Sequence, residues 1–124
     1  MNDWKLMLTI QEIKNLDDTE LGKQIAEIVG YKTQFDEELQ TWEITRKSEL
    51  TVISSDFLCQ SLDAIAKVER IIIEEDLEHS YLIALEDAIA LNQNSYFVTQ
   101  ISKVTAMARQ RAEACLYTLK KRNF

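Results

Sequence analysis

Residues 55–73 read SDFLCQSLDAIAKVERIII, and this stretch predicts the central helix of the fold. Apolar side chains recur in it at steps of three and four residues, the spacing that gathers them on one face of an α-helix. Ser55 is a favoured N-cap residue, because its hydroxyl can accept a hydrogen bond from a backbone N–H of the first turn. We therefore expect one long helix beginning at Ser55. Its expected core face consists of Leu58, Leu62, Ile65, Val68 or Glu69, and Ile72.

Helical periodicity resumes beyond an acidic break, Glu74-Glu75-Asp76, which predicts a bend. The next helix should end near residue 91, before the turn-forming sequence NQNS at residues 92–95. Residues 96–101, YFVTQI, are aromatic and β-branched and predict a strand, after which a final helix should extend to about residue 121. The core positions expected on these two helices are Leu77, Tyr81, Leu85, Ala88 and Ile89, then Val104, Ala108, Ala112, Cys115, Leu116 and Leu119.

Two capping signals lie upstream of the central helix. Thr9-x-x-Glu12 and Asp17-x-x-Glu20 fit the capping box, in which two side chains satisfy free backbone N–H groups at a helix start. They predict a helical turn at residues 10–15 and a helix from about 18 to 29, which Gly30 ends. The expected buried face of that helix is Leu21, Ile25, Ile28 and Val29. For residues 4–10, a short strand and a helix are both left open.

Residues 31–54 are the least helical part of the chain. Residues 41–45 alternate and residues 51–53 are β-branched, so one or two short strands are expected there. The 124 residues include no proline and only two glycines, and no flexible linker is visible, which fits a single domain over residues 1–124. The expected fold class is α+β, with three or four helices packed on a small antiparallel sheet. The alternative is an all-α helical bundle.

Charge is distributed unevenly along the chain, whose formal net charge is −7. Residues 103–124 hold six basic side chains and one acidic side chain, a net +5, which leaves −12 on residues 1–102. An acidic body repels nucleic acid and favours a basic partner. Cations near a helix C-terminus also interact favourably with the helix dipole, so the basic end needs no partner of its own. The candidate interaction residues are Glu74, Glu75, Glu78 and Glu86, with Lys120, Lys121 and Arg122 at the basic end.

Apolar runs in the chain are short. Even Ile71-Ile72-Ile73 is far from the roughly 20 residues that a membrane-spanning helix needs, and the N-terminus lacks the pattern of a secretory signal. The expected localisation is therefore cytoplasmic, with no membrane association. Cys59 and Cys115 are too few for a disulfide framework and lie within apolar helical patterns, so both are expected to be reduced and buried.

Few residues suggest catalysis, and no cofactor is expected. No glycine-rich phosphate loop or G-x-S-x-G elbow occurs, and His79 is the only histidine. Asp76-x-x-His79, with Glu75, could offer metal ligands from one helix face, which makes a small metal-dependent enzyme centred on His79 the alternative hypothesis. A further alternative is nucleic-acid binding through the basic C-terminal helix. Arg109 and Arg111 would point about 200° apart on that helix and would not form one stripe.

Three segments carry a family resemblance. Residues 106–119 read AMARQRAEACLYTL, residues 62–70 read LDAIAKVER and residues 25–31 read IAEIVGY. They resemble, in order, the A-T-A-x-Q-R-A-E-A-x-L-x-T-L ending, the L-N-A-M-H-E-A-E-K helix and the first helix of small phage and prophage proteins in the phage ABA sandwich group. The chain departs from that pattern at Met107, Asp63 and Ala66, where the group has threonine, asparagine and histidine. Because Met107 cannot cap the last helix, Ser102 or Thr105 is expected to do so.

The resemblance implies helices packed against a small sheet, a setting in phage or prophage genomes and no known catalytic activity. Together with the acidic charge, it predicts a non-enzymatic accessory protein that acts by protein–protein contact. Such a protein could be an acidic inhibitor, or a nucleic-acid mimic that occupies a basic groove on a host factor. Nucleic acid is not an expected partner, and homo-oligomer formation is left open.

Overall fold

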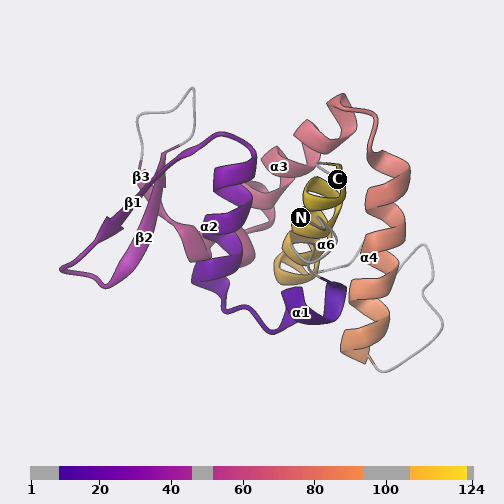
Figure 1. Ribbon diagram of the computed structural model, residues 1–124, viewed down its shortest axis with the longest axis horizontal. Coiled ribbons are helices and arrows are strands. Elements are labelled where there is room, and N and C mark those ends of the chain that lie inside the picture. Colours follow the sequence, from indigo (N-terminus) through magenta and orange to yellow (C-terminus); the bar gives the residue numbers. More distant parts are fainter. Residues whose placement is uncertain (1–8, 46–51, 94–106, 123–124) are drawn as a thin grey trace, which may run out of the picture.

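The computed structural model describes residues 9–45, 52–93 and 107–122 (Figure 1). These residues form an α+β fold, which consists of a helical body and a small antiparallel sheet. This confirms the expected fold class and excludes the all-α alternative. The elements, in chain order, are α1 (Ile10–Lys14), α2 (Asp18–Ile28), β1 (Lys32–Asp36), β2 (Thr41–Thr45), β3 (Val52–Ser54), the 3-10 helix η2 (Ser55–Cys59), α3 (Leu62–Glu74), α4 (Glu78–Gln93) and α6 (Ala108–Arg122).

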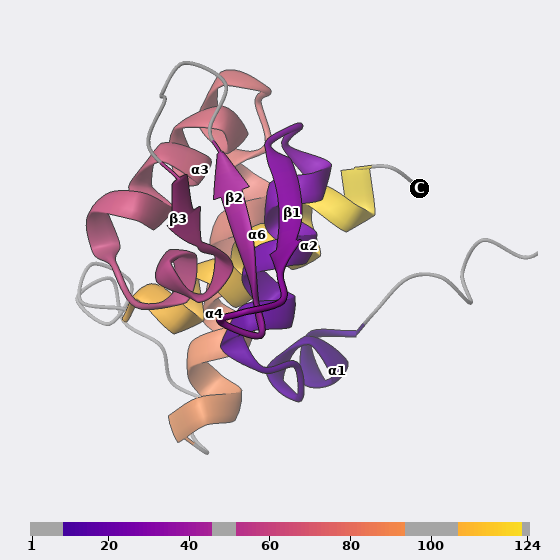
Figure 2. The same ribbon diagram turned by 90° about the vertical axis from the view of Figure 1, so that its left-hand side faces the viewer.

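The sheet has the strand order β1-β2-β3, with antiparallel pairing between neighbours. β1 and β2 pair from Lys32 opposite Thr45 to Asp36 opposite Thr41, and they form a hairpin that extends from the helical body (Figure 1). Helix α2 contacts both strands and lies behind them in Figure 2. The strand expected at residues 41–45 is confirmed, and the one expected at 51–53 is present at Val52–Ser54. β1 is a further strand.

Helix α6 is central to the fold. It contacts α1, α2, α3, α4 and η2 and lies between α2 and α4 (Figure 1). Its core face agrees with the expectation, apart from Val104, which lies outside the described residues. The buried apolar side chains of α6 are Ala108, Ala112, Ala114, Cys115, Leu116 and Leu119. On α4, Tyr81, Leu85, Ala88 and Ile89 are buried as expected, and Leu77 just before it is half-buried.

The expected capping residues begin the first two helices. Thr9 and Glu12 form a complete capping box at α1. At α2 only half of the expected box is present: Asp17 accepts a hydrogen bond from the backbone N–H of Glu20, whereas the Glu20 side chain accepts one from Gln24. Gly30 follows α2 with a φ of 84°, a conformation that glycine adopts without steric cost. The predicted bend after Glu74 is also present, since α3 ends there and Asp76 has a φ of 59°.

The single helix expected from Ser55 is wrong. Residues 55–59 form the 3-10 helix η2, and α3 begins only at Leu62. The N-cap of α3 is Ser61, whose hydroxyl accepts a hydrogen bond from the Ala64 N–H at 3.2 Å. The Ser55 hydroxyl instead donates to the carbonyl oxygen of Thr19 at 2.8 Å. Because the helix starts later, Leu62 is 54% exposed rather than buried, whereas Ile65, Val68 and Ile72 are in the core.

Other expectations concern the ends of α4 and α6. A turn was expected at residues 92–95, but Asn92 and Gln93 belong to α4, and residues 94 and 95 lie outside the described residues. At the start of α6, the Gln110 side chain accepts a hydrogen bond from the backbone N–H of Met107 at 2.9 Å, which is one half of a capping box. The strand expected at 96–101, the alternatives for residues 4–8, and the candidate caps Ser102 and Thr105 lie outside the described residues.

Candidate interaction surface

The basic side chains of α6 make internal contacts. Arg109 donates to Asp18 Oδ1 at 2.7 Å and to Glu113 Oε2 at 3.0 Å, and its other terminal nitrogen donates to the carbonyl oxygens of Lys14 at 3.2 Å and Leu16. Lys14 Nζ lies 2.8 Å from the second oxygen of Glu113, whose side chain is only 4% exposed. Arg109 thus joins the end of α1 and the start of α2 to α6.

Arg111 and Arg122 also contact carboxylates. Arg111 lies 3.4 Å from Glu69, which in turn accepts a hydrogen bond from the Tyr81 hydroxyl. Burial raises the pKa of Tyr81 well above its usual range, so this hydroxyl stays protonated and donates. Arg122 forms an ion pair with Glu75. The three arginines of α6 are therefore engaged with acidic residues from other parts of the fold.

The acidic residues predicted from the sequence lie on α4 and at the bend before it. Four exposed residues, from the last residue of α3 to the first of α4, form what we call the acidic corner: Glu74, Glu75, Asp76 and Glu78. Glu86, on α4, is half-buried and interacts with another residue, so it is not a free carboxylate.

The basic candidates lie in the last turn of α6, where Lys120 is half-buried and Lys121 and Arg122 are exposed. The Glu75–Arg122 ion pair places this basic end beside the acidic corner. The two charged regions, far apart in the sequence, thus partly neutralise each other in the fold.

No catalytic arrangement is visible in the described part of the chain. His79 is exposed near the start of α4, and the residues described here include no group of three or more His, Cys, Asp or Glu side chains placed to hold a metal ion. Cys59 and Cys115 are free thiols buried in the core. Burial raises the pKa of Cys59 to about 12 and that of Cys115 well above its ordinary value, so neither forms a nucleophilic thiolate near neutral pH.

A second acidic surface lies at the end of the β1–β2 hairpin, which we call the hairpin tip and define as residues 35–40. Asp36 Oδ1 accepts hydrogen bonds from the backbone N–H groups of Glu38 at 2.9 Å and Leu39 at 3.2 Å. The Gln40 side chain donates to the Glu37 carbonyl oxygen at 2.6 Å, and Gln40 has a φ of 53°. These contacts hold the turn in one shape without a glycine.

Apolar side chains are exposed at the hairpin tip. Leu39 is 68% exposed, and Phe35 is 41% exposed although its ring lies 5.5 Å from that of Trp42. Trp42 is also covered by Lys23 of α2, whose ammonium nitrogen is 4.4 Å from the ring centroid. The tryptophan therefore anchors the hairpin to the helical body, and Phe35 and Leu39 are left facing solvent.

The carboxylates of the hairpin form no ion pair with a cation of the described residues. In residues 9–45, 52–93 and 107–122, no lysine or arginine forms an ion pair with Asp36, Glu37, Glu38 or Glu43. A hydrogen bond between Asp36 and Glu43 lowers the pKa of Asp36, with help from the N–H groups of Leu39 and Glu38, and raises the pKa of Glu43. The opposite directions of the two shifts are those expected for two carboxyl groups that lie close to each other.

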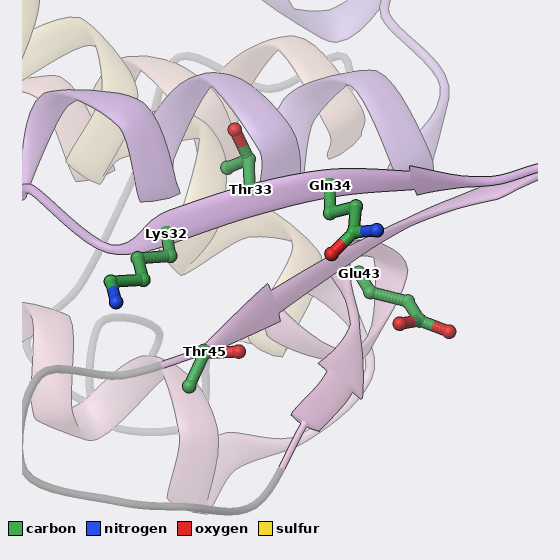
Figure 3. A pocket seen from close by; sticks show the side chains of 5 residues that line it. All are labelled: Lys32, Thr33, Gln34, Glu43 and Thr45. Carbon is green, nitrogen blue, oxygen red and sulfur yellow. The ribbon is translucent and has the colours of Figure 1, made fainter.

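Two shallow hollows lie along the hairpin. One, of about 350 Å³, is lined by Lys32, Thr33, Gln34, Glu43 and Thr45. In Figure 3, Glu43 points away from α2 and Thr33 points toward it. The other, of about 340 Å³, is lined by Gln34, Phe35, Asp36, Glu37, Glu38 and Glu43. Both linings are polar, and that of the second hollow is mostly acidic. Neither has the apolar enclosure of a small-molecule pocket, so this surface is better suited to a macromolecule.

The hairpin tip was not among the residues selected from the sequence. Its signal was the run Phe35-Asp36-Glu37-Glu38-Leu39, in which apolar residues flank three acidic ones.

None of the helices described is both long and apolar enough to cross a membrane. Comparisons with protein-family models, curated proteins and solved structures found no significant match to this chain, so its residues and their geometry are the basis for assigning a function.

Proposed function

We propose that the protein is a non-enzymatic binding protein that contacts a basic protein partner through the hairpin tip. One observation carries this proposal: Leu39 and Phe35 are exposed between carboxylates that form no ion pair with a lysine or arginine of the described residues. Burying such apolar side chains supplies binding energy, and the uncompensated charge selects a basic surface and speeds association.

The contacts of α6 favour this proposal over nucleic-acid binding. A nucleic-acid surface needs basic side chains that are available to phosphates. Arg109 and Arg111 instead contact Asp18, Glu113 and Glu69 within the fold. Among the charged side chains that the structure describes as exposed, carboxylates outnumber cations, as in a protein that competes with nucleic acid for a basic groove. A phage or prophage accessory protein that blocks a host factor in this way fits the segments that resemble the phage ABA sandwich group.

The test compares two double charge reversals that alter net charge equally. Glu37→Lys with Glu38→Lys changes the hairpin tip, and Glu74→Lys with Glu78→Lys changes the acidic corner. All four residues are exposed. Proteins retained by the immobilised wild type from a bacterial lysate would be identified by mass spectrometry, and association rates would be measured with the purified partner. We expect the hairpin variant to slow association by about tenfold or more, because electrostatic steering acts on the on-rate.

The corner variant is the matched control and should retain the partner. If the corner variant loses the partner and the hairpin variant keeps it, the contact surface is the acidic corner and our assignment is wrong. A gel shift of DNA or RNA at low salt by the wild type, abolished by Lys120→Ala with Lys121→Ala, would instead support nucleic-acid binding through the basic end.

A further inference from the structure

β1 is an edge strand of the sheet. It pairs with β2 on one side only, and no residue of Lys32–Asp36 has a hydrogen bond on its other side within the described residues. An edge strand presents unpaired backbone N–H and C=O groups that can pair with another strand. Proteins often block such edges with a central lysine, a proline or a bulge. The middle of this edge, Thr33-Gln34-Phe35, carries none of these.

The sequence of β1 is complementary to itself in the antiparallel direction. When all five residues of KTQFD pair with a second copy, Lys32 lies opposite Asp36 of that copy, Thr33 lies opposite Phe35, and Gln34 lies opposite Gln34. Opposite charges on directly facing residues stabilise antiparallel pairs, as do aromatic and β-branched neighbours. The register in which all five residues pair is therefore also the register that places Lys32 opposite Asp36.

Side chains on the outer face of β1 lack the partners that this pairing would supply. Lys32 is exposed and forms no ion pair in the described residues. Asp36 interacts with the neighbouring Glu43 carboxyl group, which lowers the pKa of Asp36, and it forms no ion pair within the described residues. On the opposite face, Phe35 is 41% exposed at the open side of its contact with Trp42.

We propose that β1 pairs in antiparallel fashion with β1 of a second copy, about a two-fold axis through Gln34, to give a continuous sheet across a homodimer. Each Lys32 then faces Asp36 of the other copy, and each Phe35 is covered by Thr33. Both α2 helices lie on the same face of the joined sheet, and the two hairpin tips point in opposite directions. This inference rests on the edge of β1 and not on the proposed function: in the dimer Glu37, Glu38 and Leu39 of the hairpin tip stay accessible, whereas Phe35 and Asp36 lie at the interface.

The dimer should be weak. Two five-residue strands bury less surface than the roughly 1,200–2,000 Å² of a stable protein interface, so we expect association between about 0.01 and 1 mM. Sedimentation equilibrium across this range would give the dissociation constant of the wild type. Lys32→Glu replaces two attractive cross-strand pairs with two repulsive ones and should weaken the dimer by about tenfold or more. Lys121→Glu changes net charge equally at an exposed site on α6 and should leave the dissociation constant unchanged.

The register is tested by cross-linking. Gln34→Cys should form a disulfide-linked dimer on mild oxidation, because the axis places this residue opposite itself, whereas Gln11→Cys, an equally exposed control on α1, should not. The native thiols are buried and do not interfere. A wild type that stays monomeric at 1 mM would overturn the proposal. It would also be overturned if Lys32→Glu dimerised as tightly as Lys121→Glu, or if both new cysteines cross-linked equally.

Discussion

Gly22 marks the closest approach between α2 and the segment that follows β3. A Cβ atom built on Gly22 would lie 1.8 Å from the carbonyl oxygen of Ser55, far inside contact distance. Two hydrogen bonds accompany this approach, from the Ser55 hydroxyl to Thr19 and from the Cys59 thiol to Asp18. Any side chain at position 22 must therefore push η2 away from α2.

Gly22→Ala should destabilise the protein, although alanine favours a helix interior over glycine by about 1 kcal/mol. The clash is with backbone rather than with a flexible side chain, so we expect a loss of about 3 kcal/mol or more in the free energy of unfolding. Urea denaturation would measure it. Ala66→Gly, at an exposed position of α3, is the control. It measures the difference in helix propensity between alanine and glycine alone, which should be about 1 kcal/mol. A higher melting temperature for Gly22→Ala would mean that α2 and η2 are not in contact.

Helix α3 provides a test of burial within one element. Ile65 is fully buried and Leu62, three residues earlier, is 54% exposed. Ile65→Ala should therefore cost about 2–5 kcal/mol by leaving a cavity. Leu62→Ala should cost less than about 1 kcal/mol, because surface substitutions rarely exceed such values. Thermal and urea unfolding of the two variants would compare them. Equal losses would show that the helix begins at Ser55 and buries Leu62, as periodicity alone suggests.

The same element shows what the sequence could predict and where it failed. Spacing identified Ile65, Val68 and Ile72 correctly, because several consecutive turns shared one apolar face. Leu62 fits that spacing as well, but the 3-10 turn at residues 55–59 breaks the helical phase and Ser61 caps the new start. β1 was not predicted as a strand, because an exposed edge strand such as KTQFD carries little apolar alternation.

The candidate surface was less predictable than the fold. The acidic residues chosen from the sequence included Glu75, which the fold pairs with Arg122 forty-seven positions away. No local pattern reveals such a partner. Conversely, the hairpin tip became a candidate only when the structure showed Leu39 to be exposed and its neighbouring carboxylates to form no ion pair within the described ranges. Charge counted along a sequence does not indicate which charges are compensated.

At the scale of the whole molecule, Arg109 connects three helices through one guanidinium group. It binds Asp18 of α2 and Glu113 of α6, and it donates to carbonyl oxygens at the end of α1. A lysine would keep the charge but could not reproduce this set of directed hydrogen bonds.

Arg109→Lys should lower the free energy of unfolding by about 1–3 kcal/mol, because hydrogen bonds to charged groups are lost while Glu113 remains buried. The expected loss of stability is modest, because the Arg109 side chain is 25% exposed and solvent screens its ion pairs. Arg70→Lys, the same exchange at an exposed position of α3, is the control and should be neutral within about 0.5 kcal/mol. Indistinguishable urea midpoints for the two variants would contradict a joining role for Arg109.

The central position of α6 also has a consequence for synthesis of the chain. The ribosome makes α1, α2, the hairpin and α3 and α4 before α6, yet α6 provides the surface that most of them cover. Until α6 emerges, Ile13, Leu21 and Ile65 have no complete core to enter. Nascent chains arrested before residue 107 should therefore be sensitive to proteases and should bind chaperones. The chain should become compact in one late step, after α6 has emerged, and not gradually during translation.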